Sequence, residues 1–250
     1  MRARTVCRAG GSTLTGMRSR SLPPVLLPLV AAGVAAWYLR SVYRFRDPVR
    51  LPQAGPGDVL SPADGTVSFV RRVQGGQVDQ VRVPELLNGP DSAPDSGPQN
   101  GPGGWLIGVF VGPLDVHYAY QPVSGTVTRV ARRDAPAGNA ALGGTGAALG
   151  FLAGRPADLL GTRGTLENAR LSSVTATPFG NVTLTLVAPG GGLRGTTYQQ
   201  EGDEARAGFK AAFMQEGGLV LLHLPAAFTP SVGVGDRVTG AQTVVASARN

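Results

Sequence analysis

Short runs of apolar residues, separated by glycine and proline, limit how this chain can fold more than any other feature. The runs are rich in β-branched side chains and often alternate apolar with polar positions, which is typical of β-strands. Helical periodicity is scarce, whereas 37 glycines and 20 prolines provide frequent turns. The sequence therefore predicts a mainly β fold with strands in the runs 66–70, 78–83, 105–111, 126–130, 182–187 and 219–224.

The positive charge of the chain is confined to its first fifth. The formal net charge is +7, from 23 basic and 16 acidic residues. Residues 1–50 hold nine arginines and one aspartate, so residues 51–250 carry 14 basic and 15 acidic groups, a net of −1. A nearly neutral body argues against a nucleic-acid partner. The single Cys7 and the two histidines leave too few ligands for a cysteine or histidine metal site, so we expect no metal.

An uncharged segment of 19 residues lies between Arg20 and Arg40. As a helix it would extend about 28 Å, close to the roughly 30 Å of a hydrocarbon core. Trp37 and Tyr38 suit an interfacial aromatic belt, and arginines flank both ends. A cleaved signal peptide is the alternative, although the segment does not end in small residues. We predict a basic leader at 1–20, a transmembrane helix at 21–40 and a β domain at 41–250 with a flexible insertion at 88–104.

One turn sequence occurs twice, sixty residues apart. Residues 61–67 and 121–127 both read Pro-x-(Asp/Ser)-Gly-Thr-Val, in which the glycine permits a positive φ before a strand begins. Residues 232–242 form a looser third copy. Such turns resemble those of biotinyl- and lipoyl-type barrel-sandwich folds. No lysine occupies a turn tip, which argues against a swinging-arm carrier.

Three ordered blocks carry a resemblance to a known family. They read FRDP at 45–48 with SPADG at 61–65, LDVH at 114–117 with PVSG at 122–125, and ENAR at 167–170. Together they resemble phosphatidylserine decarboxylase in its shorter bacterial and archaeal form, although Ala169 stands where the family usually has glutamate. The resemblance covers the chain from about Arg40 onward. It implies the decarboxylation of phosphatidylserine to phosphatidylethanolamine in phospholipid biosynthesis.

The resemblance also implies a cofactor made from the chain itself. In this family the serine of a Gly-Ser pair attacks the preceding carbonyl, the chain splits, and the new N-terminus becomes a covalent pyruvoyl group that serves as electron sink. The hydroxyl needs a base that a third group orients. By resemblance, His117 is that base and Asp64 is the orienting carboxylate. Asp64 could instead merely stabilise its turn, and His117 could be an ordinary half-buried histidine.

The basic block offers a further candidate. Arg46 could meet a lipid phosphate as a charge-assisted donor, or act only as an anchor beside the apolar segment.

The serine of the cleavage pair is missing. Counting back from Pro225 places Gly217 and Gly218 at this pair, and no serine, threonine or cysteine lies between Tyr198 and Phe228. Glycine has no hydroxyl and cannot become a pyruvoyl group. Two functions therefore stay open: a decarboxylase, or an inactive membrane-anchored pseudoenzyme that binds lipid headgroups or regulates an active paralogue. A barrel-sandwich protein of the cell envelope without lipid chemistry is a third reading.

The expected partners and location follow from the same resemblance. They are a phospholipid membrane and phosphatidylserine, with a homo-oligomer as a further option. The resemblance places the chain at the cytoplasmic face of a bacterial membrane, held by its N-terminal anchor.

Overall fold

The computed structural model describes residues 26–87, 103–135, 140–143, 146–147, 150–151, 155–190 and 192–249. The predicted leader at 1–20 and all but the last two residues of the predicted insertion at 88–104 lie outside the described residues. The chain forms two compact units, Met1–Trp37 and Tyr38–Asn250.

Helix α1 (Leu26–Ser41) occupies most of the segment predicted to cross a membrane. Its 16 residues extend about 24 Å, which is shorter than the roughly 30 Å of a hydrocarbon core. Within the described part of the chain, no helix combines the length and apolar character that a membrane span requires. The prediction of a single transmembrane anchor at 21–40, and of a membrane location that depended on it, is therefore wrong. A short 3-10 helix, η1 (Tyr43–Phe45), follows α1.

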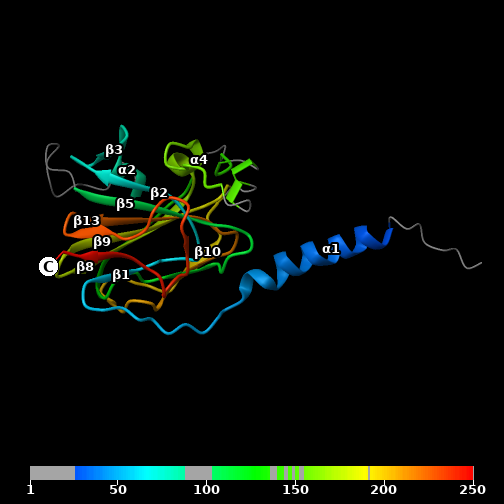
Figure 1. The fold of residues 1–250 in the computed structure, drawn as a ribbon, viewed down its shortest axis with the longest axis horizontal. Coiled ribbons are helices and arrows are strands. Elements are labelled where there is room, and N and C mark those ends of the chain that lie inside the picture. The colour runs from blue at the N-terminus through cyan, green and yellow to red at the C-terminus, as the bar shows by residue number, and fades with distance from the viewer. Residues whose placement is uncertain are drawn as a thin grey trace, which may run out of the picture. The chain divides into compact units, whose positions relative to one another are not determined.

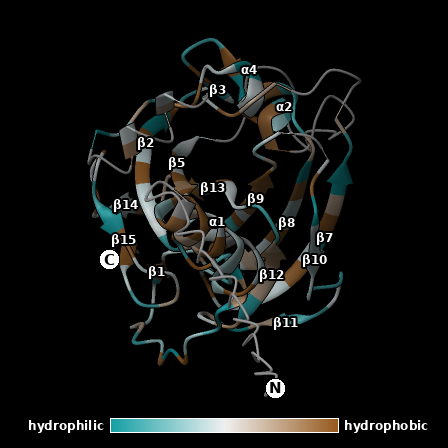
Figure 2. Ribbon diagram, turned by 90° about the vertical axis from the view of Figure 1, so that its right-hand side faces the viewer, coloured by the Kyte–Doolittle hydropathy of each residue, from teal (hydrophilic) through white to brown (hydrophobic). Residues whose placement is uncertain are grey.

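An eight-stranded antiparallel sheet forms the larger part of the body (Figure 1). It is strongly curled, and Figure 2 shows the strands from β2 to β7 following one another around the body. The prediction of a mainly β protein is thus confirmed. In spatial order the strands are β11 (Glu204–Ala205), β7 (Gly125–Arg133), β8 (Arg170–Thr177), β9 (Gly180–Val187), β13 (Gly218–Pro225), β5 (Gly104–Val111), β2 (Gly65–Val73) and β15 (Arg237–Val238).

Two three-stranded antiparallel sheets and a small hairpin complete the described β structure. Two short helices also belong to the body, α2 (Val83–Leu87) and α4 (Arg163–Glu167). The first small sheet contains β1 (Asp58–Leu60), β16 (Val244–Ala248) and β14 (Phe228–Pro230). The second contains β6 (Tyr118–Tyr120), β12 (Lys210–Met214) and β10 (Gly195–Thr197), and the hairpin joins β3 (Gln77–Val78) to β4 (Val81–Arg82).

The repeated turn is the visible part of an internal duplication. The large sheet consists of two sets of four strands with the same arrangement, β15-β2-β5-β13 and β11-β7-β8-β9. The two small sheets also correspond, since β1-β16-β14 has the same arrangement as β6-β12-β10. Gly65 and Gly125 begin equivalent strands with φ of 154° and 158°, and in both a Cβ would clash with a carbonyl oxygen of the next strand. Equivalent bulges follow Val67 and Val127. The sequence repeat therefore corresponds to a structural repeat of the whole body.

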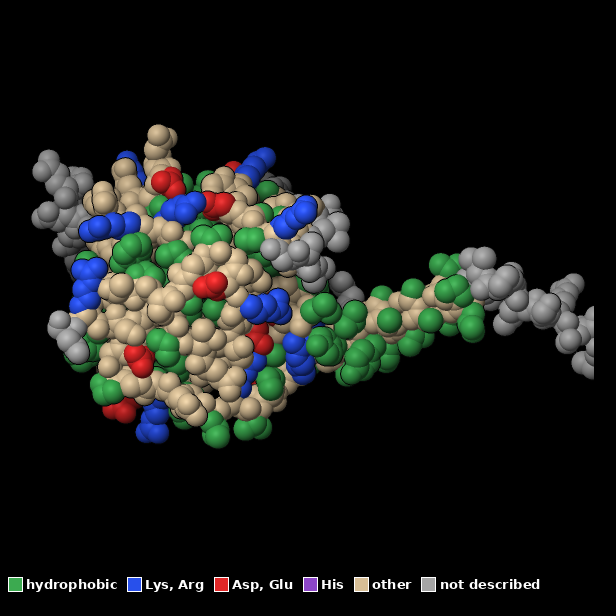
Figure 3. All heavy atoms as spheres, viewed as in Figure 1, with side chains coloured by type: hydrophobic (Ala, Val, Ile, Leu, Met, Phe, Trp, Pro, Cys, Tyr) green, Lys and Arg blue, Asp and Glu red, His purple; other side chains and the backbone are tan. Residues whose placement is uncertain are grey.

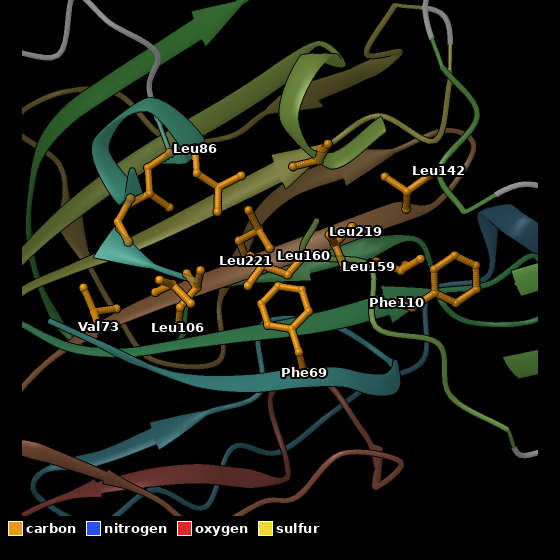
Figure 4. Packing of buried hydrophobic residues seen from close by; sticks show 14 of the residues in the cluster. Phe69, Val73, Leu86, Leu106, Phe110, Leu142, Leu159, Leu160, Leu219 and Leu221 are labelled. Atoms are coloured by element: carbon orange, nitrogen blue, oxygen red, sulfur yellow. The ribbon is translucent and has the colours of Figure 1, made fainter. Parts of the chain in front are cut away.

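The core lies on both faces of the large sheet. On one face, Leu86 of α2 packs with Phe69, Leu106 and Leu221 from β2, β5 and β13 (Figure 4). On the other face, apolar side chains of the sheet pack against the small sheets. This packing buries β13 on both faces, which explains its continuous apolar sequence.

Charged side chains on the face of the body shown in Figure 3 are of mixed sign. This agrees with the net charge of −1 counted for residues 51–250.

The predicted run 78–83 is the one that the structure divides. Asp79 and Gln80 adopt positive φ of 45° and 70°, which makes a tight turn between β3 and β4. Val83 then begins α2 rather than continuing a strand.

Candidate functional site

His117 lies at the end of the loop that joins β5 to β6. The loop is held by Asp115, whose Oδ2 accepts a hydrogen bond of 2.8 Å from the Gly112 amide. The other carboxylate oxygen of Asp115 accepts from Arg237. His117 Nε2 lies 3.2 Å from the Gly112 carbonyl oxygen, and Nδ1 has no partner among the described residues. The imidazole is thus buried, fixed at one nitrogen and unpaired at the other.

The environment of His117 keeps its imidazole neutral. Burial lowers the pKa of His117 below its usual 6.5, against a smaller raising effect of the nearby carbonyl groups. At neutral pH the side chain is therefore uncharged, which is the form able to accept a proton.

Gly217 and Gly218 lie beside this histidine at the start of β13. A Cβ on Gly217 would lie 3.6 Å from His117 Nε2 but only 2.5 Å from the Val111 carbonyl oxygen. A Cβ on Gly218 would clash with the Val187 carbonyl oxygen. The two glycines have φ of 71° and 136°, a region that side chains disfavour. The structure thus brings Gly217 and His117 together, at a place with no room for a side chain at either glycine.

These observations bear on the pyruvoyl group that the family resemblance implies. Such a group must be generated from a serine-like side chain at the cleavage pair, and the described backbone at Gly217 and Gly218 leaves no space even for a Cβ. The residues present do not fit a self-generated pyruvoyl group. For metals, the described residues contain no group of three or more His, Cys, Asp or Glu side chains that could hold an ion.

Asp64 forms a separate cluster with Arg50. The two carboxylate oxygens accept hydrogen bonds of 2.5 and 2.7 Å from the Arg50 guanidinium. Oδ1 also accepts a hydrogen bond of 2.8 Å from the Gly240 amide. Arg50 also donates a hydrogen bond to the Gly240 carbonyl oxygen. Its guanidinium lies 4.9 Å from the centre of the Tyr120 ring. No hydrogen bond joins Asp64 to His117 within the described structure, so the proposed orienting role of Asp64 stays a prediction.

Tyr120 and Arg50 are further functional candidates in this cluster. The Tyr120 hydroxyl is buried without a partner among the described residues, and burial raises its pKa to about 12. Arg50 follows the FRDP block by two residues and belongs to the first stretch that carries the family resemblance. No motif included Tyr120, and only its position three residues after His117 could have indicated it.

The basic segment after α1 lies against the loop that carries His117. Arg46 donates 2.6 Å to the Leu114 carbonyl oxygen and places its guanidinium over the Tyr43 ring. Arg44 lies 3.4 Å from the carbonyl oxygen of Gln215, two residues before Gly217. The lipid-phosphate role of Arg46 stays a prediction, and these contacts place both arginines next to the site.

The internal duplication supplies a comparison within the molecule. Ser124 is the counterpart of Asp64. Its hydroxyl accepts a hydrogen bond of 3.0 Å from the Ala207 amide, just as the Asp64 carboxylate accepts one from the Gly240 amide. Gly57 is the counterpart of His117, sixty residues earlier. The position formed by Gly57 and Ser124 therefore keeps the backbone arrangement but lacks the histidine and the carboxylate. The two equivalent positions of the repeat therefore differ in their titratable side chains.

Comparisons with known proteins identify the family of this chain. The family model described as phosphatidylserine decarboxylase matches residues 37–246. A putative archaetidylserine decarboxylase proenzyme of Methanocaldococcus jannaschii is 26% identical over 222 residues, 88% of this chain and 95% of the relative. The phosphatidylserine decarboxylase proenzyme of Thermobifida fusca is 29% identical over 94% of this chain and 83% of its own length. That of Granulibacter bethesdensis is 29% identical over 87% of this chain and 74% of its own length. The chain belongs to the phosphatidylserine decarboxylase family.

Proposed function

We propose that phosphatidylserine is the ligand of this chain, and that its decarboxylation to phosphatidylethanolamine in phospholipid biosynthesis is the reaction in which the chain takes part. The observation that carries this proposal is the match of the family over residues 37–246 together with the position of His117 next to Gly217, where an added Cβ would lie 3.6 Å from Nε2. In this proposal the neutral His117 holds or accepts a proton at the site, and Arg44 or Arg46 faces the lipid phosphate.

The reaction has a requirement that this chain does not meet alone. Loss of CO₂ from an α-amino acid needs an electron sink, which the family makes as a pyruvoyl group. The residues at Gly217 and Gly218 do not fit that group, so turnover would need a carbonyl group from another source.

The absence of a hydroxyl at the cleavage pair favours a second candidate function. In it the chain is a member of the family that no longer cleaves itself, and that binds serine phospholipids or regulates an active paralogue. Both candidates share the recognition of phosphatidylserine and differ only in turnover.

One experiment separates them. The purified full chain is incubated with phosphatidylserine labelled in the serine carboxyl group, while released CO₂ and the intact mass are measured. Release of CO₂ supports the decarboxylase, and the mass then shows whether the 25.6 kDa chain has been cut in two. A single chain that binds phosphatidylserine selectively without releasing CO₂ supports the second candidate. A chain without release and without selectivity contradicts both.

A further inference from the structure

A small cavity lies between the large sheet and the second small sheet. Its volume is about 200 Å³, and strands β7, β8, β9, β10 and β12 all contribute to its walls. The lining residues are Val130, Arg132, Leu171, Leu186, Leu193, Gly195, Thr197, Phe213 and Met214.

The cavity has apolar walls and one cationic residue. Leu186, Leu193 and Met214 are buried side chains of these walls. Arg132 is about half exposed, and its guanidinium donates a hydrogen bond of 2.7 Å to the Leu193 carbonyl oxygen. The same guanidinium also forms an exposed ion pair of 3.6 Å with Asp134. An apolar interior with a half-exposed arginine beside it suits an amphiphile whose tail enters and whose anionic part stays near water.

Contacts connect this cavity to the His117 site. The Met214 amide donates 2.9 Å to the His117 carbonyl oxygen, so one wall of the cavity is the strand that borders the site. Phe213 stacks on Phe45 with ring centres 5.5 Å apart. The Arg44 guanidinium lies 4.8 Å from the centre of the Phe45 ring. Arg44 therefore contacts both a residue that stacks on the cavity wall and the Gln215 carbonyl oxygen next to the His117 site. A lipid phosphate bound by Arg44 would be close to both places.

We infer that this cavity, which we call the alkyl slot, binds the part of one unbranched alkyl chain of the phospholipid that lies nearest to the headgroup. The inference rests on the proposed function, because it gives the tail of the same ligand a place. The slot is smaller than the roughly 300 Å³ at which pockets for whole drug-sized ligands begin, so it fits part of a chain rather than a headgroup.

A larger cavity of about 540 Å³ fits a phospholipid less well. It is lined by the segment 52–58, by Ser124 and by Phe179, among others. Asp58 is the only charged residue among its lining residues. This larger cavity includes Gly57 and Ser124, the counterparts of His117 and Asp64 in the internal duplication. Its lining residues include no cation that could bind a phosphate.

The test measures affinity against chain length for single-chain lipids. Monoacyl phosphatidylserines with 6, 8 and 10 carbons are titrated into the full chain below their micelle concentrations, with the matching monoacyl phosphatidylglycerols as equally charged controls. Each methylene that enters the slot raises the affinity about fourfold, and the increase levels off when the slot is full.

Two variants fill the slot. Val130→Trp adds an indole to a half-buried wall position, and Thr197→Trp does so from an exposed strand if the first variant fails to fold. Val234→Trp is the matched control, because this exposed valine is not among the lining residues. We expect both slot variants to lose the chain-length dependence and the control to keep it.

The outcomes separate the slot from the headgroup. If the affinity of the wild type does not depend on chain length, or if this dependence is unchanged in the folded slot variants, the alkyl slot is overturned. A preference for the serine lipid without chain-length dependence keeps the proposed function and removes the slot. Equal affinities for the two headgroups at each chain length, with a chain-length dependence that the slot variants abolish, keep the slot and contradict the recognition of phosphatidylserine.

Discussion

His223 is a buried histidine on the otherwise apolar strand β13. It lies opposite Leu106 and Thr183 on the neighbouring strands, and its Nε2 has no partner among the described residues. Burial lowers the pKa of His223 from 6.5 to about 4. His223 is therefore a residue of the core.

This histidine should make the protein sensitive to acid. Its pKa is lower in the folded than in the unfolded state, so the unfolded state takes up the proton first as the pH falls. Between about pH 6.5 and pH 4 the free energy of unfolding should decrease, by up to about 3 kcal/mol from this residue. Urea unfolding at several pH values should show a smaller decrease in His223→Leu. An identical pH dependence in both proteins would show that His223 contributes nothing.

The two glycines beside His117 set the second prediction at this scale. Gly218→Ser restores a hydroxyl at the cleavage pair, but its Cβ would clash with the Val187 carbonyl oxygen at a positive φ. We expect a single uncut chain with a free energy of unfolding lower by about 1–3 kcal/mol. Gly202→Ser is the control, because Gly202 has a φ of 92° but open space around it. Cleavage of Gly218→Ser into two polypeptides would mean that the backbone here accommodates a side chain.

Among the elements, α2 and α4 depend on one buried side chain of β8. Arg170 is 1% exposed and donates to the carbonyl oxygens of Glu85, Leu86 and Leu166. Burial lowers the pKa of Arg170 to about 10. The arginine thus joins the ends of two short helices that pack on the large sheet.

Removal of this arginine should loosen both helices. Arg170→Met leaves the carbonyl oxygens without their donor, and we expect the free energy of unfolding to fall by about 2–4 kcal/mol. Hydrogen exchange should accelerate in α2 and α4 more than in β13. Arg163→Met is the control, since it removes only an exposed ion pair with Glu167 that is worth less than about 1 kcal/mol. Equal effects of the two substitutions would contradict the role given to Arg170.

How far the sequence predicted the elements depends on how each strand is buried. β2, β5, β7, β9 and β13 were predictable because their runs are apolar and bounded by glycine. β8 was missed, since Ser172, Ser173 and Thr175 are buried polar residues that interrupt the apolar pattern. The anchor was mispredicted because an uncharged stretch of 19 residues does not by itself produce a helix with the length and apolar character of a membrane span.

The candidate site was predictable only in part. Motif blocks located His117, Asp64 and the two glycines, and the structure places His117 against Gly217. It groups Asp64 instead with Arg50, because a guanidinium offers two parallel donors to a carboxylate. Arg50 and Asp64 are 14 residues apart and both lie outside strands, so the periodicity of the strands could not show this pairing.

At the scale of the whole molecule, the body is one unit used twice with different chemistry at the two equivalent positions. One position has His117, Asp64 and a neighbouring arginine pair, whereas its counterpart has Gly57 and Ser124. Asp64 lies in the first copy of the repeated turn and His117 directly before the second, so each of the two positions takes side chains from both copies while the backbone stays alike. This view explains why the turn sequence is conserved between the halves while the titratable residues are not.

The recognition of phosphatidylserine is common to both proposed functions, and headgroup selectivity tests it most directly. Monoacyl phosphatidylserine and phosphatidylglycerol of equal chain length carry the same net charge, so a difference in affinity reports the serine group and not the charge. Calorimetric titration of the full chain should show at least about tenfold tighter binding of the serine lipid, about 1.4 kcal/mol. Equal affinities for the two lipids would contradict the account.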